Sequence, residues 1–157
     1  MKIRMMSMLR TPLALIALLA LIGCGDSNSS GLPTTKMQIG SKTYTLEIAG
    51  TEDDRAHGLM ERDTLDSDHG MIFVYRTPTT EKYWMHHTRF PLDIIFVDDR
   101  ACVVSIATMK AYDESETSSE GPYKYAIELN AGQAAATGIQ PKNQLHIPPV
   151  VDASYKN

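Results

Sequence analysis

Alternating apolar and polar residues predict two short strands near the start of the domain. The apolar positions repeat every second residue in the segments MQI at 37–39 and YTLEI at 44–48, and Gly40-Ser41 lies between them. Because side chains two residues apart point to the same face of a strand, each segment would bury one face. A short glycine-containing turn between two such segments predicts a β-hairpin.

A short helix is predicted immediately after this hairpin. Thr51 is a good N-cap residue, and Asp54 stands in the third helical position, where its carboxylate can bond back to the cap. Acidic residues in the first turn also suit the positive end of the helix dipole. We expect a short helix within residues 52–60, and Gly58 marks its expected end.

Short apolar segments separated by turn residues fill the rest of the chain. They predict strands at 70–75, 92–97, 101–109, 125–129 and 144–147, an extended piece at 83–85, a long acidic loop at 110–123 and a short helix at 132–137. Pro78 should end the first of these strands, because proline cannot donate to a sheet ladder. Many short strands with one or two short helices predict an α+β domain, mostly antiparallel, whose sheet could be partly closed into a barrel.

The N-terminus has the pattern of an export signal that ends at a lipid-attachment site. Lys2, Arg4 and Arg10 precede the apolar run LALIALLALI at 13–22. As a helix this run would be about 15 Å long against a bilayer core of about 30 Å, so it is too short to span stably and is typical of a signal peptide. It ends at Leu-Ile-Gly-Cys, which resembles the lipobox of bacterial lipoproteins, with Cys24 as the lipid-attachment residue.

This pattern divides the chain into four parts. We expect a signal peptide at 1–23, the lipidated cysteine and a flexible tether at 24–35, one globular domain at 36–150 and a C-terminal tail at 151–157. The domain would lie on the periplasmic side of the cell envelope, held at a membrane by its acyl chains. Gly25 stands where aspartate retains some enteric lipoproteins in the inner membrane, so the outer membrane is favoured.

The charge balance argues against nucleic acid as a partner. The 157 residues contain 15 Lys and Arg and 19 Asp and Glu. The signal peptide contains three of the basic residues and no acidic residue, so its removal leaves 12 basic and 19 acidic residues and a net charge of about −7. Nucleic acids and anionic membrane surfaces are both recognised by basic patches. We therefore expect no nucleic-acid partner and assign membrane attachment to the lipid anchor.

Three segments in the middle of the chain carry a family resemblance. They are RAHGLMER at 55–62, GMIF at 70–73 and WMHHTRFPLDIIFVD at 84–98. In this order and spacing they resemble the prokaryotic Domain of Unknown Function 192 family, and IELNAG at 127–132 and Gly-Ile at 138–139 are similar to its C-terminal half. The resemblance covers residues 37 to about 147. It implies a small β-rich domain, often on exported proteins, and it implies no activity.

The chain departs from this family pattern at two places. His86-His87 stand where the family usually has a basic residue and asparagine, and Lys142-Asn143 replace a usual Gly-Asp. Adjacent histidines on a strand point to opposite faces, so they cannot hold one metal ion without a bend. The resemblance also implies no histidine here. We expect neither a metal nor a cofactor.

Asp93 is the first candidate for a functional or structural site. It lies in LDIIFV at 92–97, a segment that is apolar on both faces and should be covered on both. A lone buried carboxylate is costly unless it is paired. The motif offers Arg55, Arg62 and Arg89 as partners, and one interpretation is an internal strut of Asp93 with an arginine.

The other interpretation of the same residues is a small polar pocket. Arg55 and Arg62 flank the Gly58 turn and could converge there with Asp93. Trp84 and Met85 would cover this pocket, with Thr88 close by in the same motif.

These observations leave three classes of function open. The leading hypothesis is a non-catalytic envelope module that binds a small ligand or a partner protein, which makes an enzyme the less favoured class. The alternative is a small hydrolase-like enzyme that uses Asp93 with Glu128 or with His86 or His87 as acid and base. The third is a structural or assembly-assisting lipoprotein without a pocket. Cys102, in an apolar strand-like segment, is expected to be a buried inert thiol rather than a nucleophile.

Overall fold

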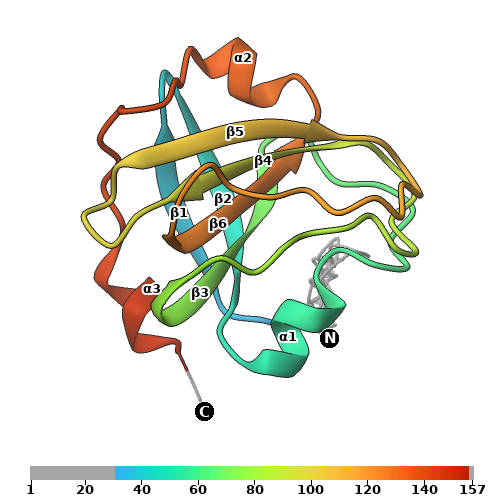
Figure 1. Cartoon of the computed structure of the whole chain (residues 1–157), viewed down its shortest axis with the longest axis horizontal. Coiled ribbons are helices and arrows are strands. Elements are labelled where there is room, and N and C mark those ends of the chain that lie inside the picture. The colour runs from blue at the N-terminus through green and yellow to red at the C-terminus, as the bar shows by residue number, and fades with distance from the viewer. Residues whose placement is uncertain (1–30, 156–157) are drawn as a thin grey trace, which may run out of the picture.

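The computed structural model describes residues 31–155, and within them one six-stranded sheet carries three short helices (Figure 1). The sheet order is β1-β2-β3-β6-β4-β5. The predicted signal peptide and Cys24 lie outside the described residues. The elements are β1 (Thr34–Ile39), β2 (Lys42–Ala49), α1 (Glu52–His57), β3 (His69–Thr79), β4 (Leu92–Val97), β5 (Val103–Met109), β6 (Tyr123–Asn130), α2 (Gln133–Thr137) and α3 (Pro149–Ala153).

The sheet is open, and its antiparallel pairs outnumber its one parallel pair, β2 with β3. The α+β prediction is therefore confirmed. The partly closed barrel is wrong, because β1 and β5 form the two ends of the strand order and do not pair with each other. The parallel pair arises because the chain crosses over through α1 between β2 and β3, which places that helix beside the sheet.

The predicted hairpin is confirmed and extends further toward the N-terminus than expected. β1 and β2 pair antiparallel from Ile39↔Lys42 to Thr34↔Glu47. Residues 34–35, assigned above to the tether, are therefore part of the sheet, because β2 offers a backbone ladder that a flexible tether would lack.

The helix prediction is confirmed at its start and at its expected end near Gly58, and the helix does not reach Met60, the outer limit of the predicted range. Thr51 Oγ1 accepts a hydrogen bond from the Asp54 backbone N–H at 3.0 Å, and Asp54 Oδ2 accepts one from the Thr51 N–H at 3.2 Å. This reciprocal pair is a capping box. The helix ends at His57 because Gly58 adopts a φ of 52°, a conformation that glycine reaches without strain.

Three strand predictions are wrong in detail. β3 continues through Pro78 to Thr79, and this is possible because its pairing with β6 is irregular between Val74 and Thr79, where no ladder bond from proline is needed. The expected extended piece at 83–85 has a single bridge, Tyr83↔Thr117. The expected strand at 144–147 likewise has only the bridge Cys102↔Gln144.

The C-terminal part of the domain is longer than expected. α3 begins at Pro149, and Val151 is fully buried, so packed structure continues beyond residue 150 where a tail was expected. Gly50 lies against this helix so closely that a Cβ there would come within 2.1 Å of the Ser154 carbonyl oxygen.

Each face of the sheet has its own hydrophobic core. The first core cluster includes Ile72, Ile95 and Ile127, and the second includes Phe73 and Phe96. Every residue of β4 is buried, which confirms that this strand is covered on both faces. α2 and α3 contribute to the first cluster, whereas Leu59, just after α1, and the segment that follows β3 cover the second. Within residues 31–155 no helix is long and apolar enough to span a membrane.

Candidate functional site

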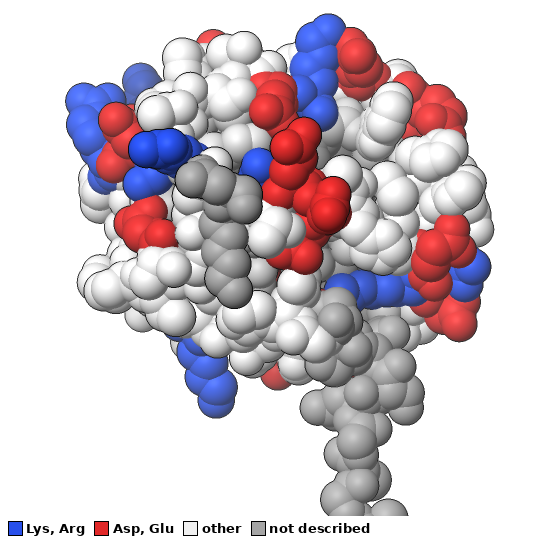
Figure 2. Space-filling view, turned by 90° about the horizontal axis from the view of Figure 1, so that it is seen from below, with Lys and Arg blue, Asp and Glu red and all other residues white. Residues whose placement is uncertain are grey.

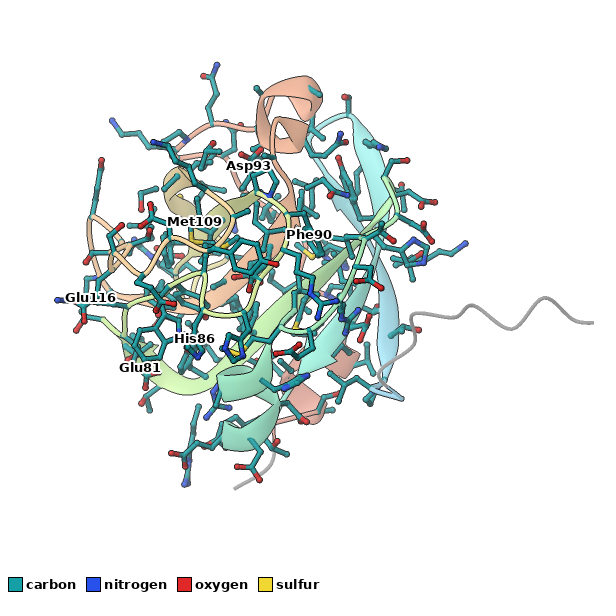
Figure 3. All side chains as sticks on the ribbon, turned by 90° about the vertical axis from the view of Figure 1, so that its right-hand side faces the viewer. Glu81, His86, Phe90, Asp93, Met109 and Glu116 are labelled. Atoms are coloured by element: carbon teal, nitrogen blue, oxygen red, sulfur yellow. The ribbon has the colours of Figure 1, made fainter. Side chains whose placement is uncertain are left out.

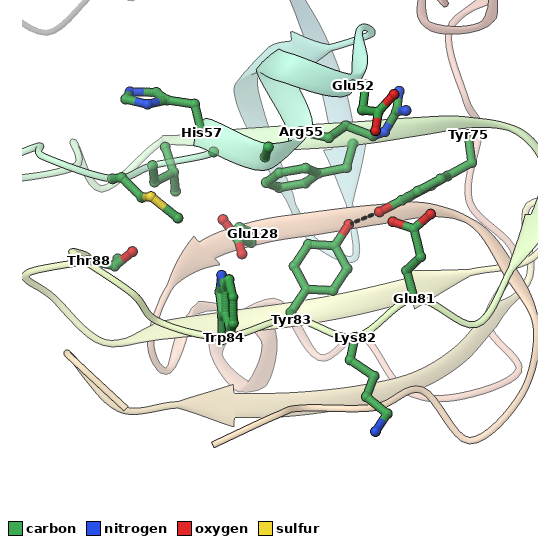
Figure 4. Close-up of a pocket in the computed structure, with 15 residues that line it drawn as sticks. Glu52, Arg55, His57, Tyr75, Glu81, Lys82, Tyr83, Trp84, Thr88 and Glu128 are labelled. Atoms are coloured by element: carbon green, nitrogen blue, oxygen red, sulfur yellow. Dashed lines mark hydrogen bonds between the residues drawn. The ribbon is translucent and has the colours of Figure 1, made fainter. Parts of the chain in front are cut away.

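A cavity of about 460 Å³ opens on the second face of the sheet (Figure 4). Its walls come from α1 and the residues after it, from β3, from β6, and from the segment between Glu81 and Thr88. This volume falls within the range of small-molecule sites, about 300–1,000 Å³. The cavity exists because the α1 crossover and the segment after β3 both cross this face without filling the space between them.

Glu128 lies at the inner end of this cavity. It belongs to β6, where it pairs with Met71 on one side and Ile94 on the other, so the sheet holds its backbone on both sides. The residue is 5% exposed, and its carboxyl points into the space between α1 and Trp84 (Figure 4). Burial raises the pKa of Glu128 to about 8. Within residues 31–155, no side chain or backbone group pairs with this carboxyl.

Aromatic side chains form one wall and the mouth of the cavity. Phe73 and Tyr83 pack edge to face with their ring centroids 5.2 Å apart. The Tyr83 hydroxyl bonds to that of Tyr75 at 3.0 Å, and burial raises the pKa of Tyr83 well above its usual value, so both stay neutral. Trp84 is 55% exposed at the mouth. A large exposed ring at a cavity mouth is available to contact a ligand.

The two cationic side chains that line the cavity are already bound elsewhere. Arg55 Nη1 donates to the carbonyl oxygens of Gly50 at 3.2 Å and Val74 at 3.1 Å, and the guanidinium lies 4.9 Å from the centre of the Tyr75 ring. Lys82 forms an ion pair with Glu116. Figure 4 shows the Lys82 ammonium directed away from Glu128.

The structure brings together only part of the predicted pocket. Arg55, Trp84 and Thr88 line the cavity. Met85 is 1% exposed and belongs to the second core cluster rather than to the lining. Arg62 instead forms a two-pronged ion pair with Glu47, at 2.5 and 2.8 Å. The predicted convergence of Arg55 and Arg62 is wrong, because α1 ends before Arg62 and the chain turns away.

Asp93 is buried on the first face of the sheet and has no part in the cavity. Its Oδ1 accepts a hydrogen bond from Thr108 Oγ1 at 2.7 Å, and its Oδ2 accepts one from the Ala134 N–H at 2.9 Å. The carboxylate thus satisfies a free N–H in the first turn of α2. The predicted pairing with an arginine is wrong, because the three candidate arginines bind other groups: Arg55 binds backbone carbonyls, Arg62 binds Glu47, and Arg89 binds Glu61 and Asp63. Figure 3 shows Asp93 close to α2 and far from His86.

Asp93 and Glu128 also do not form the predicted acid–base pair. β4 pairs with β6 so that Ile94 is opposite Glu128 and Asp93 is opposite Leu129. Directly opposed residues share a face and neighbours alternate, so the two carboxyls lie on opposite faces of the sheet.

The two histidines lie in a turn rather than on a strand. His87 adopts a φ of 50°, and this bend stacks its ring on that of His86 with centroids 4.0 Å apart. Each ring also contacts a carboxylate: His86 pairs with Glu114 at 2.9 Å and His87 with Glu61 at 2.8 Å. Neither histidine lines the cavity. Within the described residues, no three His, Cys, Asp or Glu side chains are grouped so that they could hold a metal ion.

The thiol of Cys102 is less buried than the sequence predicts. It is free and half-buried rather than buried, and the backbone of Cys102 forms one bridge with Gln144.

The local sequence marks Glu128 as a site candidate as clearly as it marks Asp93. Glu128 stands between Ile127 and Leu129 in a segment that is otherwise apolar, the same signal that marked Asp93. Phe73, Tyr83 and Glu81 carry no comparable signal as site residues. Nothing in their local sequence distinguishes them from other residues of a β-rich core.

The family model of DUF192, described as an uncharacterized ACR, matches residues 34–147. The chain belongs to the DUF192 family. The match spans the sheet from the first residue of β1 to the loop before α3, so the cavity of this DUF192 domain lies wholly inside the family's part of the chain.

Two solved structures are similar to this DUF192 domain. A protein of unknown function from Novosphingobium aromaticivorans DSM 12444 is 36% identical, with a TM-score of 0.69 over 75% of this chain and 88% of its own. A protein from Sinorhizobium meliloti 1021 named a "putative transcription regulator" is 30% identical, with a TM-score of 0.66 over 71% of this chain and 89% of its own. A comparison with curated proteins found no match.

Proposed function

We propose that this DUF192 domain is a non-catalytic binding module of the cell envelope that takes a small molecule into the cavity under α1. The observation that supports this most strongly is the cavity itself, with an unpaired carboxyl at its inner end and an exposed tryptophan at its mouth. Buried polar groups in proteins normally have partners. A ligand that bonds to Glu128 would supply the missing partner.

Binding fits this arrangement better than hydrolysis does. Hydrolysis by carboxylates uses two of them in defined positions, or one that activates a nucleophile. Asp93, the expected second carboxylate, lies on the other face of the sheet. The other two carboxylates that line the cavity, Glu52 and Glu81, are exposed to solvent rather than held beside Glu128. The third hypothesis is a structural role without a ligand. It does not explain a cavity of this size that contains a buried carboxyl.

Native mass spectrometry of the full chain, purified from its own membranes in non-ionic detergent, tests this function. Ala56 lies on α1 at the cavity, so Ala56→Trp would place a large ring across the opening. Ala136 is exposed on α2, which makes Ala136→Trp a matched control. We expect the wild type and the control to retain a small-molecule mass that Ala56→Trp loses. A wild type without any bound mass, or equal retention by Ala56→Trp, contradicts the proposal.

We propose further that the domain is held at a membrane, with the outer membrane favoured, by lipid on Cys24. The support is the sequence pattern of the first 24 residues, in which three basic side chains and a short apolar run precede this cysteine. In cell fractionation, the wild type should sediment with membranes and carry an acyl mass at its N-terminus. Cys24→Ala should become soluble, and a variant that stays in the membrane fraction would contradict lipid anchoring.

A protein or small-molecule partner fits this domain better than nucleic acid does. The name of the Sinorhizobium meliloti relative would suggest a role at DNA, but a net charge of about −7 after signal removal opposes binding to phosphates. On the face seen in Figure 2, acidic side chains gather near the middle and basic ones lie mostly toward the margins. An electrophoretic shift assay at low salt should therefore show no binding to duplex DNA.

A further inference from the structure

Resting on the proposed binding function, we propose that the cavity recognises a small organic cation, whose ammonium group is held between Glu128 and the aromatic side chains of Phe73, Tyr83 and Trp84. No family or relative described above names a ligand of this class. The proposal rests on the chemistry of the cavity wall, on the charges around it and on the absence of a partner for Glu128 among the described residues.

The carboxyl of Glu128 gives the strongest reason to expect a positive charge. A buried carboxylate is costly unless a cation or several hydrogen-bond donors compensate it. Glu128 has neither within residues 31–155, although its carboxyl points into an open cavity rather than into packed side chains (Figure 4). An ammonium group entering this space would provide the countercharge.

The aromatic wall gives the second reason. Phe73, Tyr83 and Trp84 all line the cavity that Glu128 faces. The faces of aromatic rings attract cations, and sites for quaternary ammonium groups are commonly built from several such rings. A ring at the mouth and two deeper rings would surround the methyl groups of such a ligand, while the carboxyl neutralises its charge.

The charges around the cavity give the third reason. The charged and titratable side chains that face it, besides Glu128, are Glu52, Arg55 and His57 from α1, Tyr75 from β3, and Glu81, Lys82 and Tyr83 from the segment before Trp84. The tyrosines are neutral, and Arg55 and Lys82 are bound to other groups. Glu116 neutralises Lys82, whereas Arg55 keeps its positive charge because its partners are neutral carbonyl groups. The two carboxylates of Glu52 and Glu81 outweigh this one charge, so the approach to Glu128 is net negative.

An organic cation suits this wall better than a metal ion. Magnesium and calcium require about six oxygen ligands around the ion. The inner end of the cavity offers one carboxyl among ring carbons, which matches the apolar surface of an alkylated ammonium group.

Binding of a permanent cation should depend on pH through Glu128. The burial that raises the pKa of Glu128 to about 8 keeps the empty site protonated near neutral pH. If the cation binds only the ionised carboxyl, its affinity should rise about 90-fold from pH 6 to pH 9 and then level off.

Equilibrium titration of the full chain in non-ionic detergent tests the proposal. The single tryptophan of the chain, Trp84, lies at the cavity mouth and reports occupancy by its fluorescence. The measured quantity is the midpoint concentration rather than the signal amplitude, because the centre of the His86 ring lies 5.9 Å from that of Trp84 and also influences its fluorescence. The probes are choline and tetramethylammonium, with 3,3-dimethylbutan-1-ol as the neutral isostere of choline.

We expect both cations to saturate the signal at pH 8.5, with the neutral isostere at least 10-fold weaker. Glu128→Gln should lose this preference and most of the pH dependence. Glu120→Gln removes the same charge from an exposed position away from the cavity and should match the wild type.

Equal affinity for choline and its isostere, an unchanged choline midpoint in Glu128→Gln, or no saturable effect of either cation would each overturn the proposal. A retained neutral or anionic molecule in the mass spectra would overturn it while leaving the binding function in place. The failure of the binding function itself is a different result, in which the purified wild type holds no small molecule.

Discussion

Replacing Glu128 by glutamine should change how the stability of the protein depends on pH. In the folded protein, burial raises the pKa of Glu128 to about 8, whereas its ordinary value is 4.5. Between these two values the folded protein holds a proton that the unfolded chain releases. The free energy of unfolding therefore contains a contribution that is fully present below pH 4.5 and is lost as pH rises toward 8. Glutamine has the same shape and no titration, so Glu128→Gln should lack this loss.

The magnitude follows from the two pKa values. Their difference corresponds to about 5 kcal/mol over the whole range, at about 1.4 kcal/mol for each pH unit. About 2.5 kcal/mol of this falls between pH 5 and pH 7. Because Glu128 is 5% exposed, solvent screening does not reduce the effect much. The stability advantage of Glu128→Gln over the wild type should therefore grow by about 2.5 kcal/mol across this interval.

Urea unfolding at pH 5, 6 and 7, followed by far-ultraviolet circular dichroism, measures this advantage. All other titrating groups are common to both proteins, so their contributions cancel in the comparison. Glu120→Gln, which changes an exposed carboxyl, should keep a constant difference from the wild type. If the gap between Glu128→Gln and the wild type stays constant or narrows with rising pH, then Glu128 is not an uncompensated buried carboxyl, and the reasoning about the cavity fails with it.

Three substitutions test the supporting structure. Asp93→Asn replaces one acceptor oxygen by a donor and should lower the free energy of unfolding by about 1–3 kcal/mol in urea, without changing the choline midpoint. Arg62→Ala removes the two-pronged ion pair with Glu47, which is 8% exposed, so we expect the free energy of unfolding to fall by about 3–5 kcal/mol, and a second Glu47→Gln change should restore part of it. Gly50→Ala would force a Cβ to within 2.1 Å of the Ser154 carbonyl oxygen and should lower the melting temperature by several degrees; an unchanged melting temperature would mean that α3 does not pack there.

The sequence determined the local elements where their causes are local. The hairpin within 37–48, the capping box of Thr51 with Asp54, and the complete burial of 92–97 follow from neighbouring residues, because alternation, capping and apolar runs act over a few positions. The family motif likewise lies in the sequence and holds for residues 34–147.

The tertiary structure alone decided which side chains meet. Asp93 and Glu128 carry the same local signal, a carboxylate in an apolar strand, yet one caps α2 and the other faces the cavity. The difference comes from the register of β4 against β6, which pairs residues 28 to 38 positions apart in the sequence and places the two carboxyls on opposite faces. Periodicity fixes which residues share a face within a strand, but it does not fix which strand lies next to it. The cavity exists only where the α1 crossover covers one particular face, so its residues could not be read from the sequence.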